Sequence, residues 1–258
     1  FSSYCSNAVA LNYIDDVLHF DITQTTEKSS ILFESVFNEN LNILSFIFFD
    51  NVFNLDYNKE SSLKYHKRPI FDINQSLSEY QGFSGLNLLH LVTSNKLFRV
   101  AKFFLSDEFR FEHRISINWN IKDCTGATPL HWSILFQNFE MFHLLISHSN
   151  FAANQKDQNQ NELVDAYAVN DLNQNILHMA CNNISDEIIN YILQNEIIDP
   201  KLEDNFKENV IHYAARNGIC YIFDFPCIKR LPKDIMNKKN YFKPIIKLAG
   251  ISILFINL

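Results

Sequence analysis

Four histidines that recur along this chain in one local sequence setting are its first candidates for chemistry. They are His90, His131, His178 and His212. Imidazole binds transition metals and exchanges a proton near neutral pH, so four of them could form a metal centre or an acid–base site. Each histidine, however, lies in its own copy of a repeated segment. If each copy folds as a helix pair about 10 Å from the next, the imidazoles are too far apart to share a metal at about 2 Å.

The five cysteines do not offer another reactive site. They are Cys5, Cys124, Cys181, Cys220 and Cys227, with no Cys-x-x-Cys pair and an odd count. This pattern argues against a disulfide framework or a zinc knuckle, and we expect an intracellular, cytoplasmic protein. The sequence also lacks a P-loop, a dinucleotide-binding glycine motif, His-Glu-x-x-His and Gly-x-Ser-x-Gly. We therefore predict no catalytic residue, no metal site and no cofactor.

The histidines belong to an octapeptide that is clearest at residues 126–133, Gly-Ala-Thr-Pro-Leu-His-Trp-Ser. Gly126 permits the positive φ of a tight turn, Thr128 can cap a helix, and Pro129 fits the first helical position. The motif thus encodes a turn followed at once by a helix. Looser copies occupy residues 85–92, 173–180 and 207–214. In the last copy Lys207 replaces the glycine, and because lysine rarely adopts positive φ, we expect that turn to be less regular.

An apolar pattern at helical spacing follows three of these copies. The side chains that form it stand at i, i+3 and i+4 in Met141, Leu144 and Leu145, in Ile188, Tyr191 and Ile192, and in Val100, Phe103 and Phe104. This spacing predicts a second helix with one face turned toward the neighbouring units.

A turn, a motif helix and a second apolar helix together resemble the ankyrin repeat, whose signature is Thr-Pro-Leu-His-x-Ala in about 33 residues. The interval from His178 to His212 is 34 residues, close to that unit, whereas the two earlier intervals are 41 and 47 residues. The polar stretch at residues 158–170 accounts for the second surplus as an enlarged loop. The resemblance implies an all-α, ankyrin-type solenoid of stacked helix-turn-helix repeats with short β-hairpin connections.

The repeat template also predicts how the chain is divided. An N-terminal flank at residues 1–27 precedes a repeat array at residues 28–258. The units that follow the template closely are residues 82–117, 118–153, 170–200 and 201–236. Weaker matches are a degenerate unit at residues 28–57 and a partial unit at residues 237–258. Long loops are expected at residues 58–81 and 154–169.

By resemblance, such an array is a non-catalytic scaffold for protein–protein interaction, and its partner is another protein. A small-molecule substrate is not expected, and a net charge of −7 gives no basic footprint for nucleic acid. The residues that the motif leaves facing outward are candidate contacts: Lys122, Cys124, Thr125, Trp132, Gln137, Met179, Asn182, Tyr213 and Arg216. Trp132 is the first choice, because an exposed aromatic side chain often anchors an interface. Trp132 could equally cover a neighbouring aromatic ring.

The resemblance gives the motif residues themselves a structural role. These residues are His90, Gly126, Thr128, Pro129, Leu130, His131, His178 and His212. It implies that each imidazole hydrogen-bonds backbone groups near the hairpin and so links adjacent units.

An alternative is that the repeats are the regulatory region of a larger membrane protein, such as a channel or an acyltransferase, with its functional part beyond Leu258. The first residue, Phe1, is not methionine, so we expect a fragment. Residues 245–258 are mostly apolar, yet 14 residues fall short of the roughly 20 that cross a bilayer. They fit either the last repeat or the start of a membrane segment.

Overall fold

The computed structural model describes residues 35–45, 73–74, 85–106, 117–149 and 164–232. Its regular elements there are helices, and within these ranges no β-strand forms, only an isolated bridge between Ser149 and Val164. The chain divides into two compact units, Phe1–Asn118 and Trp119–Leu258. The predicted flank at residues 1–27, most of both long loops and the partial repeat at residues 237–258 lie outside the described residues.

The first compact unit contains α3 (Leu41–Ser45), α5 (Leu88–Ser94) and α6 (Phe98–Leu105), and α5 packs against α6. Asn87 caps α5 with its side-chain oxygen, which accepts hydrogen bonds from the backbone of Leu89 and His90 at 3.1 and 3.2 Å. The cap satisfies amides that have no partner within the first turn of a helix.

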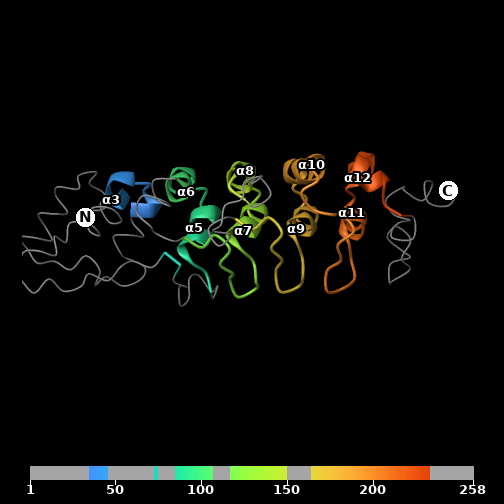
Figure 1. Cartoon of the computed structure of the whole chain (residues 1–258), viewed down its shortest axis with the longest axis horizontal. Helices are drawn as coiled ribbons and strands as arrows, with labels where there is room; N and C mark the ends of the chain where they lie inside the picture. The colour runs from blue at the N-terminus through green and yellow to red at the C-terminus, as the bar shows by residue number, and fades with distance from the viewer. Residues whose placement is uncertain (1–34, 46–72, 75–84, 107–116, 150–163, 233–258) are drawn as a thin grey trace, which may run out of the picture. The chain divides into compact units, whose positions relative to one another are not determined.

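Helix pairs build the second compact unit. The pairs are α7 (Pro129–Leu135) with α8 (Phe139–Ser147), and α9 (Ile176–Asn182) with α10 (Asp186–Gln194). They are followed by α11 (Val210–Asn217), the 3-10 helix η6 (Cys220–Asp224) and α12 (Pro226–Lys229). The motif helices α7, α9 and α11 pack in sequence, and α8 packs against α10, so each pair lies beside the next (Figure 1).

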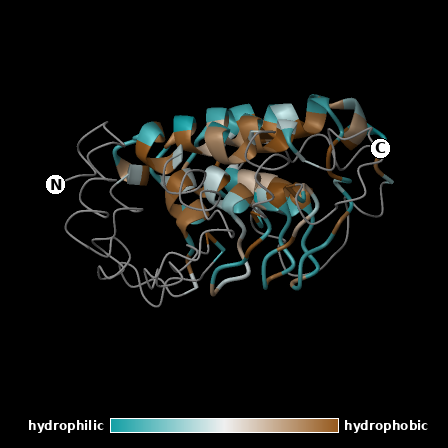
Figure 2. Cartoon of the chain, turned by 60° about the vertical axis from the view of Figure 1, so that its left-hand side comes forward, coloured by the Kyte–Doolittle hydropathy of each residue, from teal (hydrophilic) through white to brown (hydrophobic). Residues whose placement is uncertain are grey.

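The predicted apolar stripes supply the core of these pairs. Met141, Leu144 and Leu145 of α8 are all buried, as are Ile188 and Ile192 of α10, while Tyr191 is partly exposed. Figure 2 shows hydrophobic and hydrophilic residues sharing the same helices, as expected of helices that bury one face. The predicted second helices at 139–147 and 186–194 are therefore confirmed.

The last described pair departs from this pattern. Alignment with α10 at an offset of 34 residues would place one helix over residues 220–228. Pro226 falls inside that span, and proline has no amide hydrogen to donate and clashes with the preceding turn. The chain instead forms the short η6 and then begins α12 at Pro226, with Ile222 and Ile228 still buried.

Candidate protein-binding surface

A tight turn, here called a finger, precedes each motif helix of the second compact unit. The first, second and third fingers are residues 123–128, 170–175 and 204–209. In the first finger the Asp123 amide donates to the Ala127 carbonyl at 2.9 Å, and the Gly126 amide donates to the Asp123 carbonyl at 3.0 Å. Equivalent pairs of bonds close the other two fingers. The connections are thus tight turns, which carry no strand in the described residues.

One residue in each finger adopts positive φ. The angle is 74° at Gly126, 60° at Asn173 and 61° at Lys207. The expectation that the Lys207 turn would be irregular is wrong, because its amide donates to the Asp204 carbonyl at 3.1 Å as in the other fingers. The surrounding bonds hold the lysine backbone in a region that costs an L-residue about 1–2 kcal/mol.

Replacing Lys207 by glycine should therefore stabilise the protein. Glycine adopts this φ without strain but loses more entropy on folding, so we expect a net gain of about 0.5–1 kcal/mol. Urea unfolding followed by circular dichroism measures the gain. Asn205→Gly is a control within the same finger, since residue 205 does not have positive φ, and it should not be stabilised.

An aspartate at the start of the first finger organises its backbone. Asp123 Oδ1 accepts hydrogen bonds from the amides of Thr125 and Ala127 at 2.8 and 2.9 Å, and Oδ2 accepts one from Trp132 Nε1 at 2.8 Å. Burial raises the pKa of Asp123, but a bond from the Thr125 hydroxyl to Oδ1 at 2.7 Å and the three bonds above outweigh burial and leave the pKa below its ordinary value. The charged carboxylate is therefore part of the folded finger.

Two of the predicted contact residues are buried, so the prediction that they face outward is wrong. Trp132 is only 5% exposed, and its ring packs against Phe136 with centroids 5.4 Å apart. Tyr213 is 2% exposed, and its hydroxyl donates to Asp204 Oδ2 at 2.7 Å. Each of these side chains directly follows a motif histidine. Each donates a hydrogen bond to the aspartate that begins its own finger, which explains why it turns inward.

The fingers are joined to one another by backbone hydrogen bonds. The Asp171 amide of the second finger donates to the Thr125 carbonyl of the first at 3.0 Å, and the Asn205 amide of the third donates to Leu172 of the second at 3.0 Å. The first and second fingers approach closely at Gly126. A Cβ there would stand 2.6 Å from the Asp171 amide nitrogen, so only glycine fits.

The four motif histidines accept a hydrogen bond in the same way. Nδ1 of each imidazole accepts from the amide three residues earlier, at 3.1–3.2 Å. In His178 the ring proton lies on Nε2, because the carbonyl oxygen beside that nitrogen can only accept. In His178, Nε2 donates to the Leu202 carbonyl of the following unit at 3.1 Å, which confirms the expected link for this residue. His131 Nε2 is buried without a partner within hydrogen-bond distance, although the Gln174 backbone lies close enough to favour its protonation.

Because the rings of His131 and His178 are buried, stability should fall in mild acid. Burial lowers the pKa of His131 to about 4 and also lowers that of His178. Above the unfolded value of about 6.5 neither state is protonated, and the stabilisation is complete. As the pH falls from about 6.5 toward 4, the unfolded chain binds protons that the folded chain excludes.

Thermal unfolding at pH 7.5, 6.5 and 5.5 tests this pH dependence. The midpoint temperature should fall as the pH is lowered through these values, and it should fall less in His131→Gln. His143→Gln, on the exposed face of α8, should leave the decrease unchanged. Identical slopes in all three proteins would contradict a buried neutral His131.

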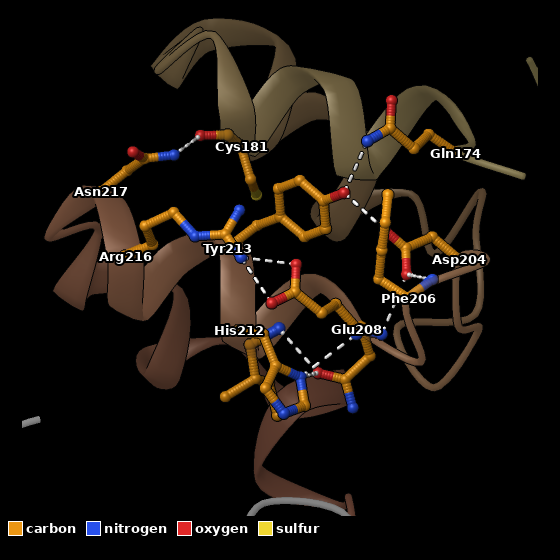
Figure 3. A network of polar contacts seen from close by, with 11 residues as sticks. Gln174, Cys181, Asp204, Phe206, Glu208, His212, Tyr213, Arg216 and Asn217 are labelled. Atoms are coloured by element: carbon orange, nitrogen blue, oxygen red, sulfur yellow. Dashed lines mark hydrogen bonds and ion pairs between the residues drawn. The ribbon is translucent and has the colours of Figure 1, made fainter. Parts of the chain in front are cut away.

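A polar network joins the second finger to the third finger and to α11 (Figure 3). Gln174 Nε2 donates to the Tyr213 hydroxyl at 2.6 Å, and that hydroxyl donates onward to Asp204. Burial, together with the bond to Asp204, raises the pKa of Tyr213, so the hydroxyl keeps its proton. Arg216 forms an ion pair with Glu208 and lies 5.1 Å from the centroid of the Tyr213 ring. Arg216, a predicted contact residue, is thus exposed but already paired with Glu208.

The remaining predicted contact residues fall into two groups. Lys122, Cys124 and Thr125 are exposed at the first finger, where Lys122 Nζ donates to the Val169 carbonyl at 2.9 Å. Gln137 is exposed in the turn after α7, Asn182 is exposed at the end of α9, and Met179 is partly exposed on α9.

Sequence reasoning missed several exposed apolar side chains. Leu172 and Phe206 are exposed on the second and third fingers. Both are two residues beyond the start of their finger, the position of Thr125 in the first, so aligning the copies would have found them. Leu135, Phe136 and Ile184 are also exposed, in the turns between the helices of a pair.

Two further results concern only the part of the chain that the structure describes. Its histidine, cysteine and acidic side chains form no group of three or more that could hold a metal ion. None of its helices combines the length and apolar character that crossing a bilayer requires. The apolar segment at residues 245–258 lies outside this part.

Comparison with known proteins agrees with the repeated geometry. The family model of the ankyrin repeat matches residues 125–159, which contain the first finger after Cys124 together with α7 and α8. A search of curated proteins gave no match. Ankyrin repeats in general are non-catalytic modules for protein–protein interaction. The chain therefore contains an ankyrin repeat at residues 125–159, and the following unit has the same kind of finger and helix pair.

Proposed function

We propose that this protein is a non-catalytic scaffold that binds another protein through a solenoid of stacked repeats. The proposed repeats are residues 82–117, 118–153, 170–200 and 201–236, with a degenerate repeat at residues 28–57. Contacts between successive helix pairs within the second compact unit support stacking of three of them. Repeat stacking creates a long surface that no single repeat possesses.

The linked fingers are the observation that carries this proposal. Backbone bonds from Asp171 to Thr125 and from Asn205 to Leu172 fix each finger against the next. The last residue of each finger is buried, while Thr125, Leu172 and Phe206 are exposed. A surface held in its bound shape before a partner arrives loses less entropy on binding, which favours affinity.

An intracellular, cytoplasmic location is also proposed. The described cysteines are free thiols: Cys124, Cys181, Cys220 and Cys227. Two of them, Cys124 and Cys220, are exposed, and exposed free thiols are typical of a reducing compartment.

Affinity capture with quantitative mass spectrometry tests the scaffold proposal. The bait is the tagged chain, and the test variant carries Leu172→Ser with Phe206→Ser, two exposed positions whose replacement should not affect folding. Proteins bound by the fingers should be recovered at least tenfold less with this variant. Cys220→Ser, exposed at the start of η6, is the control and should retain them. Equal recovery with all three baits would contradict binding through the fingers.

A further inference from the structure

A second exposed surface lies on two turns that the fingers do not include. The first turn, residues 135–138, connects α7 to α8, and the second, residues 182–185, connects α9 to α10. Asn183 Nδ2 donates to the carbonyls of Ile134 and Leu135 at 2.7 and 3.0 Å, and Gln137 Nε2 donates back to the Asn183 carbonyl at 3.0 Å. The two turns therefore adjoin and are held together.

Three apolar side chains are exposed on these turns. Leu135 is 49% exposed, Phe136 43% and Ile184 53%. We call these three residues the turn patch. In the equivalent turn after α11, the corresponding residues are Arg216, Asn217 and Gly218. Since a polar or absent side chain serves the same turn there, the fold does not require apolar residues at these positions.

Ile184 is also unfavourable for the backbone. Its φ is 52°, and the equivalent Gln137 and Gly218 have φ of 49° and 70°. A β-branched residue at positive φ is a marked outlier, whereas glycine or asparagine adopts it readily. An isoleucine that is strained and about half exposed contributes little to folding, and exposed apolar patches are typical of interaction sites.

The charged side chains of these two turns and of the helix starts that follow them have one sign. Glu140 lies in the first turn of α8, and Asp186 and Glu187 lie in the first turn of α10; all three are exposed. Residues 135–142 and 182–189 contain no lysine or arginine. A partner that fits would present apolar side chains flanked by positive charges.

We infer that the turn patch binds a basic amphipathic helix of a partner protein, an inference that rests on the proposed protein-binding function. The partner's helix places apolar side chains at i, i+3 and i+4 against Leu135, Phe136 and Ile184. Its lysine or arginine side chains form ion pairs with Glu140, Asp186 and Glu187. Helices with such a stripe bind other protein surfaces through their apolar face. The partner contacts these two turns and not the fingers.

A designed peptide tests the inference without knowledge of the partner. The probe is an 18-residue fluorescein-labelled helix of leucine and lysine with leucine on one face, titrated into the whole chain at 0.15 M salt (about physiological ionic strength) and followed by fluorescence anisotropy. A peptide with glutamate in place of lysine is the charge control. We expect saturable binding of the lysine peptide, and binding at least tenfold weaker for the glutamate peptide.

Phe136→Asn and Ile184→Asn locate the binding site. Asparagine occupies the place of Phe136 in the next two turns and tolerates positive φ at position 184, so both variants should keep the backbone of their turns, although Phe136→Asn removes a ring that packs against Trp132. Each should weaken binding of the lysine peptide at least tenfold. Phe206→Asn, an exposed aromatic on the third finger, is the matched control and should bind as the unchanged chain does.

Unchanged affinity in Phe136→Asn and Ile184→Asn, or equal weakening in Phe206→Asn, would overturn the inference. So would equal binding of the two peptides. None of these results would affect the proposed scaffold function, which depends on capture of proteins through Leu172 and Phe206.

Discussion

Replacing Gly126 by alanine is expected to lower the free energy of unfolding by about 3–4 kcal/mol, combining strain at positive φ with the loss of a hydrogen bond. Gly126 has φ of 74°, and an added Cβ would stand 2.3 Å from Asp171 Oδ1 and 2.6 Å from its backbone nitrogen. The carboxylate can rotate away, but the backbone cannot yield without moving the second finger. That movement breaks the bond from the Asp171 amide to the Thr125 carbonyl.

Gly218→Ala is a matched control for the backbone strain. Gly218 has φ of 70°, close to that of Gly126, and a Cβ there would meet no atom within 4 Å. This variant should lose only about 1–2 kcal/mol, the cost of the left-handed conformation. Urea unfolding of both variants gives the difference. Equal losses would show that the fingers do not press against each other at Gly126.

Replacing Trp132 by alanine should destabilise the protein by about 3–5 kcal/mol, the usual cost of removing a large buried aromatic side chain. Trp132 is 5% exposed, packs against Phe136 and donates to Asp123 Oδ2 at 2.8 Å. Its loss leaves a cavity beside α7 and removes one donor from a carboxylate that organises the first finger. The thermal midpoint measured by circular dichroism should fall accordingly.

Trp132→Phe separates the two contributions at this position. Phenylalanine keeps most of the apolar burial but cannot donate to Asp123, so we expect a smaller loss of about 1–2 kcal/mol. An alanine variant as stable as the unchanged chain would contradict the buried position, and would restore Trp132 as an outward-facing contact.

The local geometry of the repeat could be predicted because a few residues determine it. Asparagine at the helix caps, Pro129 at the start of α7 and apolar stripes at helical spacing each act within about one turn of helix. The bond from His178 to Leu202 could be predicted only from the family resemblance, since it joins two units.

The outward or inward direction of single side chains could not be predicted in the same way. Trp132 and Tyr213 stand where the repeat pattern leaves the residue type open, and both turn inward because Asp123 and Asp204 accept their hydrogen bonds. The regular turn at Lys207 was missed because the closing bonds outweigh the preference of one residue. In each case the deciding partner lies several residues away.

Amide hydrogen exchange by NMR tests the linked fingers most directly. Asp171 and Asn205 are exposed residues, yet each backbone amide donates to the preceding finger at 3.0 Å. Both amides should therefore exchange much more slowly than those of free turns, and Gly126→Ala should remove the protection of Asp171 while leaving that of Asn205. Exchange of both amides at the rate of an unstructured peptide in the unchanged chain would contradict the account.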